Sequence, residues 1–111
     1  MQRGEIYKLD FGNPQGSVQA GIRPALIIQN DIGNRSSNTT IVAAITSKHK
    51  KSYPFHVEIS RNESGLPEDS TILLEQIQTV PQARLVGKIG NIGKSKMMEV
   101  DEALIISLGL H

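Results

Sequence analysis

Apolar and polar residues alternate along several short segments of this chain, a period of two that is typical of β-strands with one buried face. Other segments are continuous apolar runs rich in β-branched residues, and these are typical of fully buried strands. The strands expected from the two patterns cover residues 5–11, 23–30, 39–47, 55–60, 71–80 and 84–92. Pro24 is expected at the first position of its strand, where no ladder donor is lost. The strand 71–80 is expected to bend near Glu75.

The segments between these strands carry turn signals, and the end of the chain has a different period. Residues 12–21, 30–38 and 62–70 are rich in Gly, Asn, Ser and Pro, so they are predicted as loops, with one short helical turn in the second. From Lys94 onward, apolar residues recur at helical spacing. This stripe consists of Met97, Val100, Leu104 and Leu108, and it is widened by Met98 and Ile105. The pattern predicts one amphipathic helix of about fourteen residues that stops at Gly109.

Strands joined by turns without crossover helices predict antiparallel pairing. The expected fold is mainly β with a C-terminal α-helix, in which a small curled antiparallel β-barrel is packed against the helix. At 111 residues the chain fits one domain, which we expect to cover residues 1–111.

Composition narrows the function classes. The chain has no Cys, which excludes disulfides and thiolate metal sites and agrees with a reducing cytoplasm. The three His residues are scattered and no HExxH or Walker sequence occurs, so we expect no metal and no cofactor. No apolar run is long enough for a signal peptide or a membrane span. The net charge is only +1, but residues 46–51 (TSKHKK) form a local cationic run.

Arg23 is the first candidate for chemistry. Its guanidinium is always charged and presents a planar fork of donors that suits a phosphate. The preceding loop contains Gly21, which permits close backbone approach to a ligand, and Pro24 fixes the backbone from which the side chain projects. The alternative is a surface arginine at a strand end, paired with Glu5 or Asp31.

Thr46 and Ser47 end the apolar strand that follows the strand of Arg23. A hydroxyl at a strand end often caps a turn, and the functional alternative is a donor to a phosphoryl oxygen. If the two strands pair as an antiparallel hairpin, Arg23 near the start of one lies close to Thr46 near the end of the other. The two residues would then form a phosphate clamp.

The cationic run that includes Lys48 is either a solvated loop or a patch that steers a polyanion, with Tyr53 and Phe55 available for base stacking. Alternation in residues 55–60 places His56 on the outward face of its strand, as a surface or interface histidine. Glu68 and Asp69 are interpreted as parts of a solvated turn.

Several blocks of the sequence resemble, in order and spacing, the MazF/PemK (Kid-like) toxins of bacterial toxin–antitoxin modules. The blocks are RGEIYKLDF, GSVQAGIRPALIIQND, NTTIVAAITS, HVEIS, STILLEQIQTV and DEALIISLGL. The resemblance covers nearly the whole chain. It implies a small SH3-like or CcdB-like curled β-barrel with a terminal helix, a homodimer, and a cytoplasmic toxin that a partly disordered acidic MazE-like antitoxin neutralises.

The resemblance also implies an activity and a set of site residues. The implied activity is that of a metal-independent, sequence-specific endoribonuclease, or mRNA interferase, which cuts single-stranded RNA. The 2′-hydroxyl attacks the adjacent phosphate and leaves a 2′,3′-cyclic phosphate and a 5′-hydroxyl. Arg23 and Thr46 match the catalytic positions. The implied substrate-binding residues are Ser17, Gln19, Ser47, Lys48, Tyr53, Glu75 and Gln76.

One departure from the family concerns the glycine loop. Many relatives read Gly-Ser-Glu-Gln-Gly-Gly there, whereas this chain has Val18 and Ala20 in place of the acidic residue and one glycine. A loop glutamate therefore cannot be the general base in this protein. An arginine side chain is always charged, so Arg23 is a poor base at neutral pH. The sequence assigns no proton acceptor, and His56 is a candidate without other support.

Two other functions remain alternatives. A CcdB-like toxin with the same fold would bind a protein target such as DNA gyrase and cut nothing, and it would not need Arg23 and Thr46 at facing strand ends. An SH3-like adaptor would need exposed aromatic residues for proline-rich ligands. With two Tyr, two Phe and no Trp, the chain gives that function little support.

Overall fold

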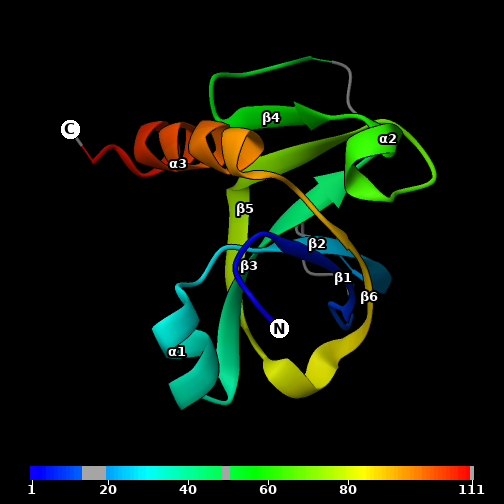
Figure 1. The fold of residues 1–111 in the computed structure, drawn as a ribbon, viewed down its shortest axis with the longest axis vertical. Coiled ribbons are helices and arrows are strands. Elements are labelled where there is room, and N and C mark those ends of the chain that lie inside the picture. Colours follow the sequence, from blue (N-terminus) through cyan, green and yellow to red (C-terminus); the bar gives the residue numbers. More distant parts are fainter. Residues whose placement is uncertain (14–19, 49–50, 111) are drawn as a thin grey trace.

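The computed structural model describes residues 1–13, 20–48 and 51–110, in which six antiparallel strands form one curled sheet (Figure 1). The strand order is β4-β5-β3-β2-β1-β6, so β4 and β6 are its edges. The elements are β1 (Glu5–Asp10), β2 (Ile22–Ile27), α1 (Asp31–Ser36), β3 (Thr39–Thr46), β4 (His56–Ile59), α2 (Arg61–Ser64), β5 (Ser70–Pro81), the 3-10 helix η1 (Gln82–Arg84), β6 (Leu85–Asn91) and α3 (Lys94–Leu108). This confirms the predicted class, a mainly β, barrel-like fold with a C-terminal helix.

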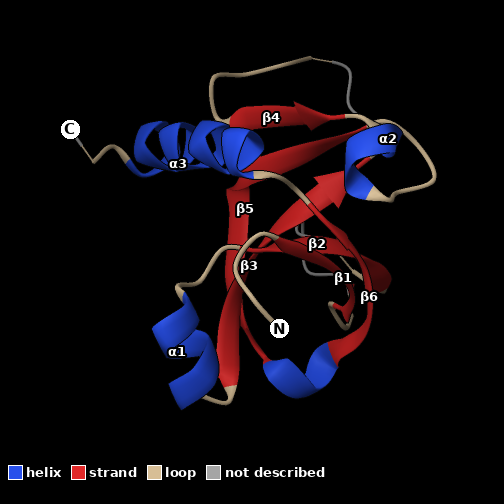
Figure 2. Cartoon of the chain, in the orientation of Figure 1, coloured by secondary structure: helices blue, strands red, loops and turns tan. Residues whose placement is uncertain are grey.

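Helix α3 lies across one side of β4 and β5, and the helices stay at the periphery of the sheet (Figure 2). The apolar face of the sheet on this side forms the larger core together with Val100 and Ala103 of α3. The buried residues of this core are Ile6, Leu26, Ile28, Ala43, Ile45, Val57, Ile59, Leu66, Ile72, Leu74, Ile92, Val100 and Ala103. Two hydrogen bonds also attach α3 to the sheet. Ser107 Oγ donates to the carbonyl oxygen of Leu74, and Lys96 Nζ donates to the carbonyl oxygen of Glu58, both at 2.8 Å.

The opposite side of the sheet holds a second core inside the curl. Its buried residues are Leu9, Phe11, Ala25, Ile27, Val42, Ala44, Leu73 and Val80. Because successive side chains of a strand point to opposite faces, a strand that is buried on both faces reads as a continuous apolar run. The two-sided burial therefore explains why β2 and β3 lack the alternation seen in β1 and β4.

Strand β5 is long and pairs with two neighbouring strands. Its first half pairs with both β4 and β3, and its second half pairs with β3 alone. The register against β3 shifts between Ala43 and Ala44, whose partners are Ile77 and Leu73. Such a bulge bends the strand, and it includes Glu75, where the sequence predicted a bend.

Some details differ from the sequence predictions. Pro24 is the third residue of β2, not the first, and it lies opposite Lys8; the recorded pairing with β3 begins one residue later, at Ala25. The apolar stripe of α3 is narrower than predicted, because Met98 and Leu108 are 65% and 54% exposed. The helix ends as predicted, with Gly109 at a φ of 66°.

A short helix within the predicted turn cluster was missed. Helix α2 begins with a capping box, in which Ser60 Oγ accepts from the Glu63 N–H and the Glu63 carboxylate accepts from the Ser60 N–H. Ser60 and Glu63 have the spacing of that signature, so the sequence did contain the signal. The helix ends at Gly65, whose φ is 81°.

An ion pair joins β1 to the edge strand β6. Lys88 Nζ of β6 lies 2.7 Å from Glu5 Oε2 of β1. The hydrogen bond to Glu5 and its negative charge raise the pKa of Lys88. Burial acts to raise the pKa of Glu5, but hydrogen bonds from Lys88 and the Gln2 N–H, with the positive charge of Lys88, outweigh it and lower that pKa. The pair therefore links β1 to β6 most strongly when both groups are charged.

No helix in the described ranges 1–13, 20–48 and 51–110 is both long and apolar enough to cross a membrane.

Gly90 is a point of close backbone approach between β6 and α2. A Cβ at this position would overlap the carbonyl oxygen of Ser64, the last residue of α2, whereas a Cβ at Gly87 on the same strand would meet nothing within 4 Å. The turn that follows α2 is therefore held near β6 by contact between backbones.

We expect Gly90→Ala to lower the free energy of unfolding by about 1–3 kcal/mol, the usual range for forcing extra atoms into packed structure. Gly87→Ala is the matched control and is expected to change the free energy by no more than about 1 kcal/mol, in the stabilising direction. Urea unfolding of both variants measures the difference. Equal stability of the two variants would contradict the close approach.

Candidate active site

The pairing of β2 with β3 brings the two main candidate residues together. The two strands are antiparallel, with Ala25 opposite Ala44 and Ile27 opposite Val42. The pairing ends at Ala25 and Ala44, and the same register, continued by two residues, would set Arg23 opposite Thr46. Residues directly opposite each other project from the same face of a sheet. The antiparallel hairpin predicted from the sequence is therefore present, with Arg23 and Thr46 just beyond its last pair.

Both residues line one cavity of about 180 Å³. At roughly 30 Å³ for each water molecule, its volume corresponds to about six waters, which is room for a phosphate group. The walls come from the start of β2, the end of β3 and the turn after α2. They are formed by Arg23, Pro24, Ile45, Thr46, Ser47, Lys48, Leu66, Pro67, Glu68 and Ser70. A second cavity of about 350 Å³ adjoins it, because Arg23, Pro24, Leu66 and Pro67 line both.

The hydroxyl of Thr46 combines the two roles considered from the sequence. Its Oγ1 accepts a hydrogen bond from the Lys48 N–H at 3.1 Å, so it does cap the turn that follows β3. A hydroxyl that accepts one bond still has its own proton to donate. The backbone contact thus orients the oxygen, and the proton can point to an anion in the cavity.

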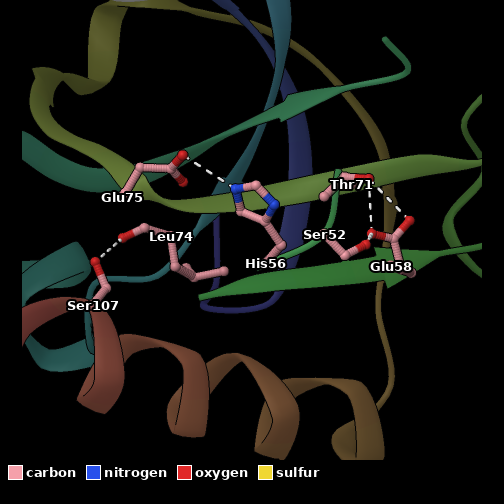
Figure 3. A network of polar contacts seen from close by, with 7 residues as sticks. All are labelled: Ser52, His56, Glu58, Thr71, Leu74, Glu75 and Ser107. Carbon is pink, nitrogen blue, oxygen red and sulfur yellow. Dashed lines mark hydrogen bonds and ion pairs between the residues drawn. The ribbon is translucent and has the colours of Figure 1, made fainter. Parts of the chain in front are cut away.

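Residues that lie opposite one another on neighbouring strands form a row across the sheet, and the row that begins with Arg23 and Thr46 continues to β5 and β4. Thr46 is opposite Thr71 of β5, and Thr71 is opposite Glu58 of β4. The Thr71 hydroxyl lies 3.0 and 3.1 Å from the two carboxylate oxygens of Glu58. Figure 3 shows Thr71 and Glu58 on the side of the strands that faces away from α3. One row on one face therefore carries a cation, two hydroxyls and a carboxylate.

A second polar pair lies beside this row (Figure 3). His56 Nε2 is 3.1 Å from Glu75 Oε2, and the rings of Tyr53 and Phe55 meet the His56 ring edge-on, with centroids 5.3 and 5.1 Å away. His56 was predicted to be a surface or interface histidine on the outward face, but in this chain it is not a surface residue, since its side chain is only 6% exposed. The two aromatic rings cover it, and among the described residues its Nδ1 has no hydrogen-bond partner.

The other predicted site residues fall into three groups. Ser47 and Lys48 line the cavity with Arg23 and Thr46. Tyr53, 44% exposed, lies in the aromatic cluster near β4, and Glu75 and the half-buried Gln76 lie at the bulge of β5. The remaining two, Ser17 and Gln19, lie outside the described residues.

The carboxylates considered as surface partners of Arg23 are engaged elsewhere. Glu5 pairs with Lys88, and Asp31 Oδ1 accepts from the Arg3 N–H at 2.8 Å. The aromatic side chains of the predicted stacking surface also contact one another. Tyr53 and Phe55 stack at 5.1 Å, and Lys51 Nζ lies 5.5 Å from the Tyr53 ring centroid. The described part of the predicted cationic run thus divides between the cavity and the aromatic cluster.

Sequence reasoning missed the wall that the turn after α2 contributes. All three residues of this wall, Leu66, Pro67 and Glu68, were predicted only as parts of a turn cluster, with Glu68 in a solvated turn, yet all three line the cavity. No local pattern indicates this, because the contact depends on how α2 packs against β6. The row from Thr46 to Glu58 was also missed, since it depends on the register of β5.

Within residues 1–13, 20–48 and 51–110, no group of three or more His, Cys, Asp or Glu side chains is placed to hold a metal ion.

The chain was compared with protein families, curated proteins and solved structures. The family model described as "PemK-like, MazF-like toxin of type II toxin-antitoxin system" matches residues 2–108. The chain is 52% identical over 112 residues to "Endoribonuclease MazF" of Staphylococcus saprophyticus subsp. saprophyticus, a match covering 100% of this chain and 93% of that protein.

Solved structures show the same fold at lower identity. A mycobacterial "Endoribonuclease in complex with its cognate antitoxin" has a TM-score of 0.84 at 23% identity, covering 100% of this chain and 97% of that chain. MazF from Deinococcus radiodurans has a TM-score of 0.80 at 23% identity, with coverage of 98% and 96%.

A curled antiparallel sheet with one C-terminal helix, and a cavity lined by Arg23 and Thr46 near the strand ends, define a small, mainly β, barrel-like protein. Within this class, the chain belongs to the family of PemK-like, MazF-like toxins of type II toxin–antitoxin systems.

Proposed function

We propose that this protein is an endoribonuclease toxin that cuts single-stranded RNA at a specific sequence, without a metal ion, by attack of a 2′-hydroxyl on the adjacent phosphate. The products are a 2′,3′-cyclic phosphate and a 5′-hydroxyl. The endoribonuclease class follows from family membership and from the 52% identity over the whole chain to a protein named Endoribonuclease MazF. That relationship also favours a nuclease over a CcdB-like binder of gyrase.

The observation that carries the proposal is that Arg23 and Thr46, near the start of β2 and at the end of β3, line one cavity. Attack on a phosphate builds negative charge on its non-bridging oxygens, and fixed donors that meet this charge lower the barrier. The guanidinium of Arg23 supplies a charged fork of donors, and Thr46 supplies a hydroxyl that the Lys48 N–H orients. Both act without a metal ion.

The remaining residues bind and position the RNA in this proposal. Ser47 and Lys48 line the cavity beside the scissile phosphate. Tyr53, Glu75 and Gln76 are assigned to flanking nucleotides, because an exposed ring can stack on a base and the polar side chains can bond to base edges. Ser17 and Gln19 are assigned to the loop beside the site.

We also propose that the protein is a homodimer that a MazE-like antitoxin neutralises, and that it acts in the cytoplasm as one domain spanning residues 1–111. One solved relative is described as an endoribonuclease with its cognate antitoxin. Exposed apolar side chains at Met98 and Ile106 of α3, and at Leu110 just beyond its end, support a protein contact at this helix.

The direct test is to incubate the purified protein with a long unstructured RNA in EDTA. We expect cleavage at a recurring short sequence, and we expect end mapping to find 5′-hydroxyls and 2′,3′-cyclic phosphates. Cleavage that stops in EDTA, or that leaves 5′-phosphates, would count against this mechanism.

Arg23→Ala is expected to lower the rate of cleavage by a factor of at least about 10²–10³, because it removes a preorganised donor to the developing charge. The variant should unfold at the same denaturant concentration as the wild type. Arg35→Ala, at an exposed arginine of α1, is the matched control and should cleave normally. A folded Arg23→Ala protein of normal activity would remove Arg23 from the mechanism.

Lys48, Lys50 and Lys51 are expected to attract RNA through its phosphates. Each phosphate contact on a single strand contributes about 0.7 to the slope of log affinity against log salt. Replacing all three with Gln should therefore weaken binding and flatten the slope by up to about 2. Lys94→Gln, at the start of α3, is the control. An unchanged slope would assign this run to a solvated loop.

A further inference from the structure

We propose that Glu58 is the proton acceptor of the cleavage reaction and that Thr71 is the positioning residue that holds its carboxylate. The inference rests on the proposed function, because attack by a 2′-hydroxyl requires a group that removes its proton. The loop at residues 12–21 contains no Asp or Glu. The acceptor must therefore come from elsewhere in the fold.

Strand register places Glu58 in the same row as the phosphate-binding pair. Thr46 lies opposite Thr71, and Thr71 lies opposite Glu58. Neighbouring strands are about 4.8 Å apart, so the row from Arg23 to Glu58 spans about 14 Å between Cα atoms. The long side chains at its two ends project from the same face. Glu58 and Thr71 do not line the cavity at Arg23 and Thr46, so a nucleotide whose phosphate lies there must extend its ribose along this face, past Thr71, to reach the carboxylate.

The carboxylate of Glu58 is held in place yet remains accessible. Thr71 is fully buried, and its hydroxyl proton is shared between the two carboxylate oxygens at 3.0 and 3.1 Å. Ser52 Oγ donates to Oε2 at 3.3 Å, and Lys96 Nζ bonds the Glu58 carbonyl oxygen from the other side of the strand. Glu58 itself is exposed. A base that is fixed before the substrate arrives loses little entropy in the reaction.

The other candidate bases lack one of these properties. His56 is 6% exposed and Glu75 engages its Nε2, while Glu75 lies at the bulge of β5, outside the row. Glu68 lines the cavity, but in the part of the chain that the structure describes no hydrogen bond or ion pair holds its carboxylate. Glu68 is therefore the rival that an experiment must separate from Glu58.

The cleavage step transfers one proton to Glu58 and one from water. The 2′-oxygen forms a bond to phosphorus while its proton passes to the Glu58 carboxylate. The bond between phosphorus and the 5′-oxygen breaks, and its electron pair leaves with the 5′-oxygen, which takes a proton from water. The Glu58 carboxyl then returns its proton to solvent, so that the enzyme is unchanged.

The test is the pH dependence of kcat for RNA cleavage in EDTA by the full-length protein. Because only an ionised carboxylate accepts a proton, the wild-type rate should fall when the solution is made acidic enough to protonate the acceptor. We expect Glu58→Gln to lower kcat by a factor of about 10²–10⁴ and to remove this acid limb, with little change in KM. Glu58→Asp should be slow but should keep the limb.

Thr71 is tested by its conservative replacement. Thr71→Val removes the hydroxyl and should lower kcat and move the acid limb, while Thr71→Ser should restore both. A Thr71→Val protein that is less stable but keeps the wild-type pH profile would show that Thr71 has only a structural role, and it would overturn that part of the inference.

Three comparisons keep the outcomes separate. Glu99→Gln, at an exposed carboxylate of α3, should behave as wild type. If the wild-type protein itself does not cut RNA, the proposed function fails. If the wild type cuts and Glu58→Gln keeps its rate and acid limb, or if only Glu68→Gln loses them, Glu58 is not the acceptor. Should Glu58→Gln not fold, Glu58→Asp gives the decision, since a wild-type kcat in that variant would exclude Glu58.

Discussion

The register of β2 against β3 is the constraint on which the site depends. Because side chains alternate between faces with a period of two, a slip of one residue would turn Thr46 to the opposite face from Arg23. Ala25 and Ile27 pack in one core and Leu26 in the other, so a slip would exchange side chains of different size between two close-packed cores. The free energy gained by burying both faces of β2 and β3 thus also aligns Arg23 with the hydroxyl of Thr46. No separate interaction is needed to bring them together.

The same reasoning extends to the outer strands. The bulge opposite Ala43 and Ala44 separates β5 into a part that carries Thr71 and a part that pairs only with β3. The first part also pairs with β4, so the row reaches Glu58. Helix α3 packs against the other face of these strands. Its apolar contacts therefore stabilise the row from behind while the face with the polar side chains remains uncovered by α3.

Much of the fold was predictable because it is encoded locally. The alternation in β1, the apolar runs of β2 and β3 and the helical stripe before Gly109 each produced the expected element. The hairpin of β2 and β3 followed from their order, and it brought Arg23 and Thr46 together. The capping box of α2 was also local, and it was missed because Gly, Pro and Ser dominate the segment around it.

What could not be predicted depends on contacts between distant segments. The burial of His56 requires Tyr53 and Phe55 to fold over it, whereas alternation within β4 indicated only an outward direction. The position of Pro24 inside β2 was missed because the start of the strand depends on where β1 ends its pairing. The row from Thr46 to Glu58 requires three strands in register, which no single segment encodes.

The contact between Gly90 and Ser64 has a consequence for how this protein can change over time. One wall of the cavity, at Leu66, Pro67 and Glu68, follows the point where the backbones of α2 and β6 approach closely. Leu66 is buried in the larger core, whereas Pro67 and Glu68 are exposed, so the location of the wall does not depend on these two side chains. Substitutions along this turn can alter the charge and shape presented to a ligand while the frame stays fixed, so the wall is a place where related toxins can diverge in selectivity without losing their fold.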